Sequence, residues 1–360
     1  MTRFPRLLAA LAAGSLVVAA CGGDDDAADT TEAPATTEAP ATTATPDEPV
    51  AMGPITLYSG RGEDLVQPII DAFVADTGIE VEVRYGNSAE MLLLIQEEGA
   101  NSPADVYYSQ GAGFLGILSA ADGLVELPAD VLDRVIDDGL RSPDREWVGL
   151  TGRARTVVYN TDLLTEADVP DSLLDFTDPA WSGRIGWAPT NASFQDHVTA
   201  LRFLIGEDAT REWLEGIIAN DPVVYENNGA ILEGVANGEV EVGLTNHYYL
   251  YRLLIEDPDF PVANKFYSDG DPGALVNIAG AGVLATSDDQ DAAVELIRYL
   301  LSVEAQQMFS SANFELPVVE GVDADPQLPT IDSLVLPAFD LNLLLDLEGT
   351  VDLLIEVGAL

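Results

Sequence analysis

The chain has 360 residues, of which 62 are Asp or Glu and 15 are Lys or Arg, so its formal net charge at pH 7 is −47. This excess of acid disfavours nucleic acid and anionic lipid surfaces as partners, because both are bound through basic patches. We attribute the acidity to a saline habitat, a hypothesis in which dissolved salt screens the repulsion between like charges.

The first twenty residues are typical of a secretion signal. Arg3 and Arg6 give it a basic start, and a short apolar stretch leads to Cys21, the only cysteine of the chain. An exported chain with one cysteine cannot form an internal disulfide, and "VVAAC" resembles a bacterial lipobox. We therefore predict a signal peptide over residues 1–20 and a lipid on Cys21. A plain cleaved signal with an incidental cysteine is the alternative.

Residues 21–53 are dominated by Gly, Asp, Ala, Thr, Glu and Pro, with the repeat "TTEAPATTEAPATT". A segment of this composition cannot bury enough apolar surface to offset its chain entropy. We predict a disordered tether that carries a folded part beginning at residue 54.

The first hundred residues of that part alternate between strand and helix patterns. A strand followed by a polar loop is predicted over residues 55–63, and further strands over residues 79–86 and 104–110. Amphipathic helices are predicted over residues 64–78 and 88–99, the second with Ser88 as a plausible cap. This alternation predicts an α/β fold with a largely parallel sheet.

A long extended run over residues 147–164 interrupts the alternation. Helices then follow near residues 193–204, 209–220 and 229–238, with a strand ending at Asn246 and a returning strand near residues 274–285. The longest strong helix is predicted over residues 288–311. The C-terminal segment has four acidic residues, which predicts an amphipathic helix and not a membrane anchor.

Residues 111–116, "GAGFLG", fit the G-x-G-x-x-G pattern of dinucleotide-binding turns, after a predicted strand and before a helix. Nicotinamide cofactors are scarce outside the cell, and the following segment is a poor second strand. We therefore interpret these glycines as a tight turn that lets helix and sheet pack closely.

Other enzyme signatures are thin. The chain has two histidines, and neither G-x-S-x-G nor H-E-x-x-H occurs. A carboxylate pair for glycoside cleavage is possible among 62 acids, but nothing singles one out. We expect a binding protein and not an enzyme.

Basic and amide side chains gather instead where predicted strands end, the usual place for ligands in α/β proteins. Arg153 and Arg155 share one face of the extended run, because side chains alternate along a strand. The turn 189–195 enters a helix and is a natural seat for an anion. The candidate residues are Ser59, Arg61, Arg153, Arg155, Asn191, Ser193, Asn228 and Asn246.

Tyr248 and Tyr249 follow the strand that ends at Asn246. Packing of one ring in the core and one at the surface is the simpler explanation. The alternative is that both oxygens bind one ion, which requires a strand-to-helix corner, since neighbouring residues of a regular strand face opposite ways. Ferric iron prefers anionic oxygen ligands, and a trivalent ion can drive the proton from a phenol.

At these residues the sequence resembles the periplasmic ferric-iron-binding proteins of bacterial ABC transporters, within the extracellular solute-binding proteins. The resemblance extends from "LYSGRGEDLVQPIIDAF" through "PAWSGRIGWAPTNASFQ" and "NHYYLYR" to "NFELPV". It implies a two-lobed α/β periplasmic-binding-protein fold of type II, hinged by crossover strands. It also implies Fe(III) held in the cleft between lobes with a synergistic anion, carbonate or phosphate.

By position, Tyr248 and Tyr249 match the paired tyrosine ligands of that family. Asn228, Asn246 and the turn from Asn191 to Ser193 match its anion contacts. Arg61, Arg153 and Arg155 are expected to hold the anion as well, with Ser59, Ser109 and Gln110 in the cleft.

The sequence departs from the family at three places. Gly62 stands where some members supply a histidine, Ser109 where some supply a glutamate, and Gly152 lies in the segment that gives others a third tyrosine. The protein is thus expected to supply only two firm ligands, with anion oxygens and water completing the shell.

The resemblance implies that lobe one comprises residues 54–150 and 276–328, and lobe two residues 151–275 and 329–360. We predict a monomeric lipoprotein on the outer face of the cytoplasmic membrane that delivers iron to an ABC permease. A binding protein for a small organic solute or oxyanion in the same cleft is the alternative.

Overall fold

The computed structural model describes residues 52–334, 337 and 339–360. The predicted signal peptide, Cys21 and nearly all of the predicted tether lie outside the described residues.

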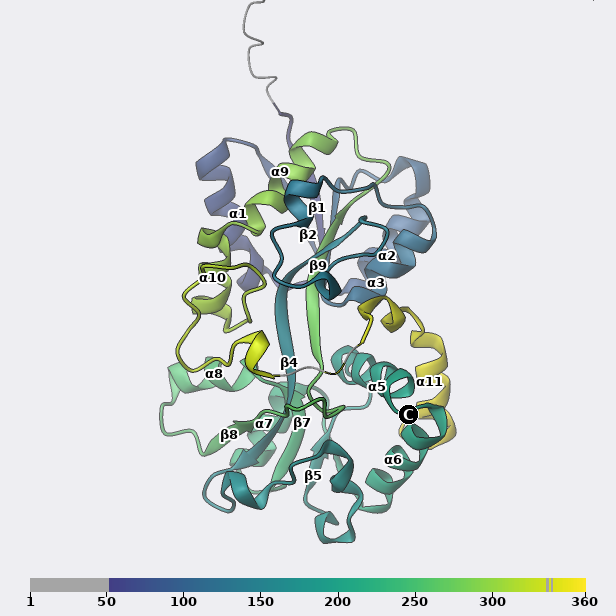
Figure 1. Ribbon diagram of the computed structural model, residues 1–360, viewed down its shortest axis with the longest axis vertical. Helices are drawn as coiled ribbons and strands as arrows, with labels where there is room; N and C mark the ends of the chain where they lie inside the picture. The colour runs from purple at the N-terminus through teal and green to yellow at the C-terminus, as the bar shows by residue number, and fades with distance from the viewer. Residues whose placement is uncertain (1–51, 335–336, 338) are drawn as a thin grey trace, which may run out of the picture. The chain divides into compact units, whose positions relative to one another are not determined.

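A mixed sheet of nine strands forms the centre of the described part (Figure 1). Its order is β2-β1-β3-β9-β4-β7-β5-β6, and β8 pairs with β4 beside this path. The strands are β1 (Ile55–Ser59), β2 (Val81–Tyr85), β3 (Val106–Ser109), β4 (Val148–Asn160), β5 (Ile185–Trp187), β6 (Val223–Val224), β7 (Val242–Asn246), β8 (Val262–Lys265) and β9 (Val276–Val283).

The prediction of a largely parallel sheet is correct for the outer strands and wrong for the central ones. β1 runs parallel to β2 and β3, and β5 runs parallel to β6 and β7. β9, however, is antiparallel to β3 and β4, and β4 is antiparallel to β7 and β8. The two central strands cross between the parallel groups and return, so their directions oppose.

β4 and β9 are the long strands that pass from the upper to the lower group of elements in Figure 1. Their register pairs Arg153 with Asn277, while two residues further along β4 Arg155 pairs with Asn246 of β7. β4 therefore changes its neighbour from β9 to β7 at the two arginines that the sequence singled out.

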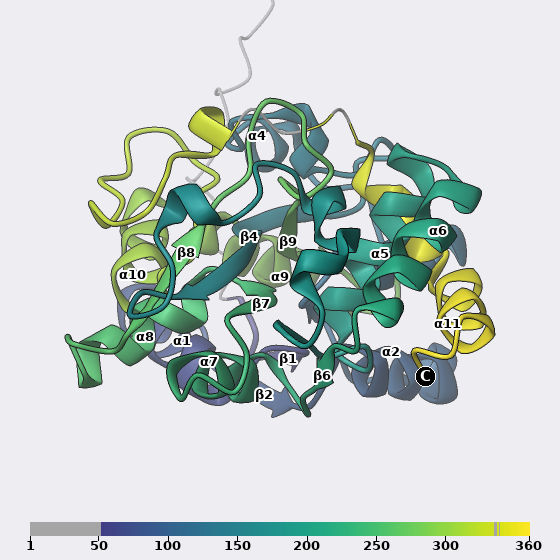
Figure 2. The same ribbon diagram turned by 90° about the horizontal axis from the view of Figure 1, so that it is seen from below.

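The helices cover both faces of this sheet (Figures 1 and 2). They are α1 (Glu63–Thr77), α2 (Ser88–Glu98), α3 (Ala112–Ala120), α4 (Ala129–Leu132), α5 (Ala192–Leu204), α6 (Glu207–Ala219), α7 (Asn228–Ala236), α8 (Tyr248–Glu256), α9 (Gln290–Leu300), α10 (Val303–Asn313) and α11 (Leu347–Glu356). None of the described helices is long and apolar enough to span a bilayer.

Two details of the helix predictions are wrong. The cap of α2 is Asn87 and not Ser88: the Asn87 side chain accepts from the Glu90 amide at 2.8 Å, and the Glu90 carboxylate accepts from the Asn87 amide. The predicted helix over residues 288–311 is two helices, because Ser302 interrupts it and caps α10 through the amide of Ala305 at 3.1 Å.

The buried apolar residues form two large clusters. One joins β1, β3 and β9 to α1, α2, α3, α9 and α10. The other joins β5 and β7 to α5, α6 and α11. The boundaries between the two lobes remain a prediction.

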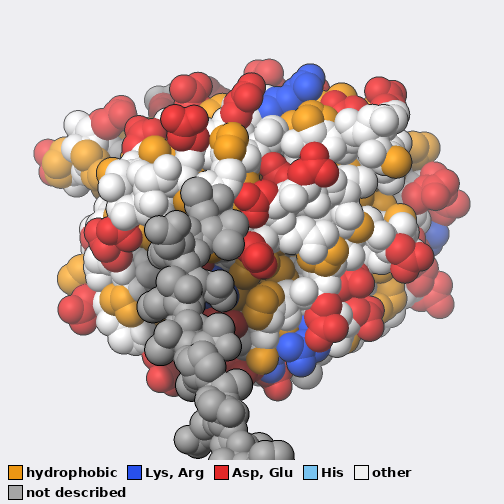
Figure 3. All heavy atoms as spheres, turned by 90° about the horizontal axis from the view of Figure 1, so that it is seen from above, with side chains coloured by type: hydrophobic (Ala, Val, Ile, Leu, Met, Phe, Trp, Pro, Cys, Tyr) orange, Lys and Arg blue, Asp and Glu red, His pale blue; other side chains and the backbone are white. Residues whose placement is uncertain are grey.

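Acidic side chains are scattered over the face shown in Figure 3, and basic side chains are few there. Most of the described arginines are paired with a carboxylate, as in the contacts of Arg141 with Asp133 and of Arg298 with Asp130. The excess of acid is therefore carried on the surface.

Candidate metal site

The tyrosine pair lies at the corner between β7 and α8, and this predicted corner is confirmed. β7 ends at Asn246, His247 already has helical backbone angles, and α8 begins at Tyr248. The two rings therefore do not point to opposite faces as they would on a strand. Their centroids are 4.3 Å apart with an interplanar angle of 25°, so the rings are stacked.

Tyr248 is 3% exposed and Tyr249 is half-buried. Burial raises the pKa of the Tyr249 phenol, and the neighbouring Tyr248 phenol raises it further. Asn228 and the positive charge of Arg61 act in the opposite direction. The Tyr249 phenol is thus neutral at physiological pH until a stronger positive charge displaces its proton.

His247 fixes the corner. Its Nε2 lies 2.8 Å from the carbonyl oxygen of Phe314, and its Nδ1 lies 3.1 Å from the amide nitrogen of Ala154. Burial lowers its pKa to about 4. A neutral ring with both nitrogens engaged by the backbone has a structural role and is not available as a ligand.

Amide and hydroxyl groups surround Arg155 on β4. Its Nη1 donates to Asn246 Oδ1 at 2.9 Å and to Ser193 Oγ at 3.3 Å. Ser193 Oγ in turn donates to Asn191 Oδ1 at 2.6 Å, and Asn228 Nδ2 reaches Ser193 Oγ at 3.3 Å. The structure therefore brings together the predicted anion-binding residues of β4, β7, α5 and α7.

Asn191 also caps α5, because its side chain accepts from the Ser193 amide at 3.1 Å. Burial lowers the pKa of Arg155 to about 10, and Arg153 contributes to this shift, while Tyr249 and Asp196 oppose it. Arg155 nevertheless remains charged at neutral pH, so this cluster offers a buried cation and several neutral donors to an anion.

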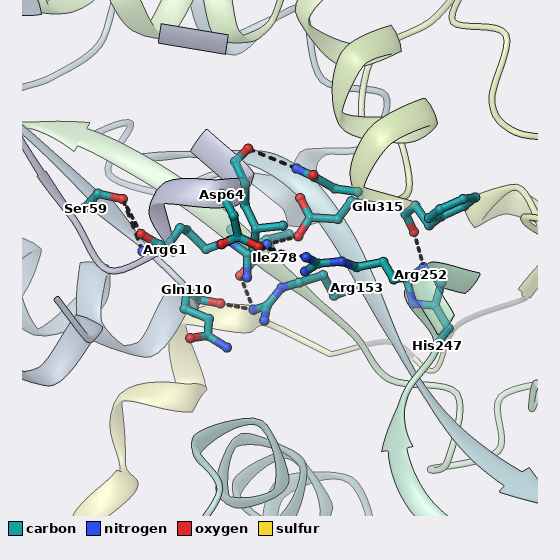
Figure 4. Close-up of polar contacts among 12 residues, drawn as sticks. Ser59, Arg61, Asp64, Gln110, Arg153, His247, Arg252, Ile278 and Glu315 are labelled. Carbon is teal, nitrogen blue, oxygen red and sulfur yellow. Dashed lines mark hydrogen bonds and ion pairs between the residues drawn. The ribbon is translucent and has the colours of Figure 1, made fainter. Parts of the chain in front are cut away.

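Arg153 lies on the same face of β4 as Arg155, and its side chain contacts the end of β3 and the strand β9. Its Nη2 donates to the backbone carbonyl of Gln110 and, at 3.1 Å, to that of Ile278 (Figure 4). The backbone amide of Gln110 donates to Ser88 Oγ at 2.8 Å, which holds this residue in place. Arg153 thus links the end of β3 with β9.

Arg61 pairs with Glu315, and the two side chains point toward each other in Figure 4. The Arg61 guanidinium also lies over Tyr248, with its central carbon 6.0 Å from the ring centroid. Sequence reasoning placed Arg61 at the site but missed Glu315. The two residues are 254 positions apart, and no local pattern relates them.

Ser59 and Ser109 shape their own loops. Ser59 Oγ donates to the Arg61 carbonyl at 3.0 Å and accepts from the Arg61 amide at 3.2 Å. Ser109 Oγ makes the same pair of contacts with Gly111. Both hydroxyls are therefore engaged by the backbone two residues further on.

Several buried polar atoms at this site have no hydrogen-bond partner among the described residues. They are Arg61 Nε, Tyr108 Oη, Arg153 Nε and Nη1, Arg155 Nε, Asn228 Oδ1 and Glu315 Oε2. Buried polar groups are normally paired, since leaving one unpaired costs free energy. Among these atoms, the nitrogens of Arg61, Arg153 and Arg155 are donors, so they fit a place that binds an anionic ligand.

No group of three or more His, Cys, Asp or Glu side chains is arranged to hold a metal within residues 52–334, 337 and 339–360. The two phenol oxygens of Tyr248 and Tyr249 therefore remain the predicted metal donors of the described site.

The glycines of "GAGFLG" serve packing. A Cβ on Gly113 would lie 2.5 Å from the Leu344 carbonyl oxygen, and one on Gly111 would lie 2.9 Å from the Asp196 carboxylate. Both close approaches are to segments outside the sheet, so these two glycines allow close packing there, and the tight turn between helix and sheet stays a prediction.

Comparisons with known proteins show which chains this one is similar to. The family model for bacterial extracellular solute-binding protein matches residues 59–307. The major ferric iron-binding protein of Neisseria meningitidis serogroup B is 35% identical over 311 residues, which cover 86% of this chain and 94% of that protein. The Fe(3+)-binding periplasmic protein of Serratia marcescens is 33% identical over 309 residues, which cover 85% of this chain and 90% of that protein.

Among solved structures, iron-bound HitA from Pseudomonas aeruginosa matches with a TM-score of 0.80 and 35% identity, covering 85% of this chain and 99% of that one. FutA from Trichodesmium, in complex with iron and citrate, matches with a TM-score of 0.77 and 31% identity, covering 85% of this chain and 99% of that one. This likeness confirms the predicted fold class, the two-lobed α/β fold of periplasmic binding proteins.

Proposed function

Since the chain belongs to the family of bacterial extracellular solute-binding proteins, we propose that it binds ferric iron for an ABC transporter through Tyr248 and Tyr249. The observation that carries this proposal is the stacked phenol pair at the start of α8, 4.3 Å between centroids. Two phenolates are hard anionic donors of the kind that Fe(III) prefers, and the relatives named above are iron-binding proteins.

A synergistic anion completes the iron shell in this proposal. The donors for it are Arg153 and Arg155, whose partnerless nitrogen atoms are buried, together with the polar side chains of Asn191, Ser193, Asn228 and Asn246. Guanidinium groups bind oxyanions through several N–H donors at once, which suits carbonate or phosphate. Ser59, Ser109 and Gln110 belong to the loops that enclose the site.

The remaining parts of the proposal concern delivery. The protein is anchored by a lipid on Cys21, carries its cargo on the outer face of the cytoplasmic membrane, and passes it as a monomer to a permease. Ligand binding would favour a closed arrangement of the two lobes through contacts made only in that state. The crossover strands β4 and β9 are the natural hinge, because they run through both groups of elements.

The second candidate is an oxyanion or small organic solute bound without iron. The buried arginine and amide donors favour it, because they suit an oxyanion whether or not a metal is present. The stacked tyrosines would then form an aromatic wall of the site.

Addition of a ferric salt to iron-free, full-length protein with carbonate or phosphate tests the proposal. We expect a visible absorption band from charge transfer between phenolate and Fe(III). Tyr248→Phe and Tyr249→Phe should each weaken iron binding by about a hundred-fold or more, beyond the usual effect of changing a group outside the ligand shell. The affinities are measured by competition with a chelator.

Tyr251→Phe is the matched control, because Tyr251 lies on the same helix and its hydroxyl donates to the Gln327 carbonyl at 3.0 Å. It should keep the band and the affinity. Full iron affinity in both Tyr248→Phe and Tyr249→Phe would remove the iron proposal. Binding of carbonate, phosphate or an organic acid without any coloured iron complex would favour the second candidate.

A further inference from the structure

Glu315 lies next to the corner that presents the tyrosines. It follows Phe314, which ends α10 in a left-handed conformation with φ 56°. The Phe314 carbonyl accepts from His247, the residue directly before Tyr248. Glu315 is thereby fixed by the backbone close to the site, and its side chain is 0% exposed.

Arg61 connects Glu315 to Tyr248. It comes from the loop between β1 and α1, pairs with the Glu315 carboxylate, and lies over the Tyr248 ring at 6.0 Å. Its side chain is only 3% exposed. Glu315, Arg61 and Tyr248 thus form a buried series that joins three segments far apart in the chain.

The ion pair of Arg61 and Glu315 leaves hydrogen-bonding atoms unpaired, which is unusual for a buried ion pair with only a structural role. Glu315 Oε2 and Arg61 Nε have no partner among the described residues. A buried ion pair offsets its desolvation only when its remaining donors and acceptors are bonded. Burial alone would lower the pKa of Arg61, but Glu315, Tyr248 and Tyr108 together raise it, so the guanidinium stays charged.

We propose that Glu315 is a positioning residue for ferric iron binding: it holds the Arg61 guanidinium against Tyr248 and balances its charge. This inference rests on the proposed function. Glu315 acts through Arg61 and is not itself a ligand of the metal.

The charge balance has a direct consequence at the phenolate. Without the Glu315 charge, Arg61 interacts more strongly with the electron pairs of the Tyr248 phenolate, for which it then competes with iron. An unbalanced cation beside Fe(III) also repels it. Iron binding should weaken, and the charge-transfer band should move to shorter wavelength, because a stabilised phenolate gives up its electron less readily.

The test compares the full-length wild-type protein with Glu315→Gln and with the double variant Arg61→Gln/Glu315→Gln, each loaded with ferric iron and carbonate. Glu315→Gln should bind iron about ten-fold more weakly, the usual effect of one charge-assisted contact, with the band shifted to shorter wavelength. The double variant should regain most of the affinity, and its band should move back to longer wavelength, because the unbalanced cation is gone.

Two further variants complete the test. Glu241→Gln disrupts another ion pair, that of Arg184 and Glu241, whose side chains are 31% and 30% exposed; it should change neither affinity nor band. Glu315→Asp keeps the charge but shortens the reach, so it should shift the band in the same direction by less. If Glu315→Gln fails to fold, the band and the iron affinity of Glu315→Asp test the inference in its place.

An unshifted band and unchanged affinity in the Glu315 variants would overturn the inference while the proposed function stands. A loss that persists undiminished in the double variant would also overturn it, since the effect of Glu315 would then not act through an unbalanced Arg61 charge. A wild-type protein that gives no band would remove the proposed function, and the inference with it.

Discussion

Asp196 is a buried carboxylate within contact distance of the site. Its Oδ2 accepts from Asn277 Nδ2 at 2.6 Å, and the charges of Arg153 and Arg155 lie nearby. Burial nevertheless raises its pKa to about 6, because desolvation outweighs the attraction of both arginines. Arg153 and Arg155, which we propose hold the anion, therefore lie near a carboxylate that is costly to ionise.

This shift predicts a dependence of stability on pH. The folded protein holds the Asp196 proton up to about pH 6, whereas the unfolded chain releases it near pH 4. The contribution of Asp196 is therefore fully present below about pH 4 and is lost as pH rises to about 6. Relative to Asp196→Asn, the wild-type protein should lose on the order of 2 kcal/mol of unfolding free energy across that window.

Urea unfolding of the iron-free proteins at several pH values measures this difference. Asp168→Asn is a control of opposite sign, because hydrogen bonds from Thr165 lower the pKa of Asp168. Relative to that variant the wild-type protein should gain stability as pH rises. A difference between wild type and Asp196→Asn that stays constant from pH 4 to pH 6 would show that the carboxylate is not buried as described.

At the scale of elements, the corner between β7 and α8 could be predicted because its signals are local. The strand pattern ends at Asn246, and the helical pattern that follows begins with the two tyrosines. Most of the other helices and strands were predicted for the same reason.

What the sequence did not reveal depends on contacts between distant segments. The antiparallel direction of β4 and β9 follows from their pairing across the sheet, which no local pattern encodes. Glu315 was missed because its partner Arg61 is 254 residues away. The Ser302 break did have a local signal, a serine before "VEAQ", but the apolar periodicity on both sides obscured it.

The Ser302 cap gives a prediction for this element. Ser302→Ala removes the acceptor for the Ala305 amide and should lower the free energy of unfolding by about 1 kcal/mol, the usual cost of an N-cap. Ser311→Ala is the control on the same helix, since its exposed hydroxyl donates only to the Gln307 carbonyl at 2.7 Å. Urea unfolding should separate the two variants, and an equal effect from both would contradict the cap.

At the scale of the whole molecule, the acid excess predicts a dependence on salt. A net charge of −47 repels itself in the folded state, and ions screen this repulsion. The melting temperature of the iron-free protein should rise by several degrees between about 0.05 M and 2 M sodium chloride, with most of the rise below about 0.5 M, where the Debye length changes most. A melting temperature indifferent to salt would contradict the saline hypothesis.

The central claim is that one ferric ion binds to the phenol oxygens of both Tyr248 and Tyr249 at the corner between β7 and α8. Anomalous X-ray diffraction at the iron edge, on crystals of the iron-loaded protein, tests it most directly. We predict one strong anomalous peak within bonding distance of both Tyr248 Oη and Tyr249 Oη. A peak elsewhere, or one that contacts only a single tyrosine, would contradict the account.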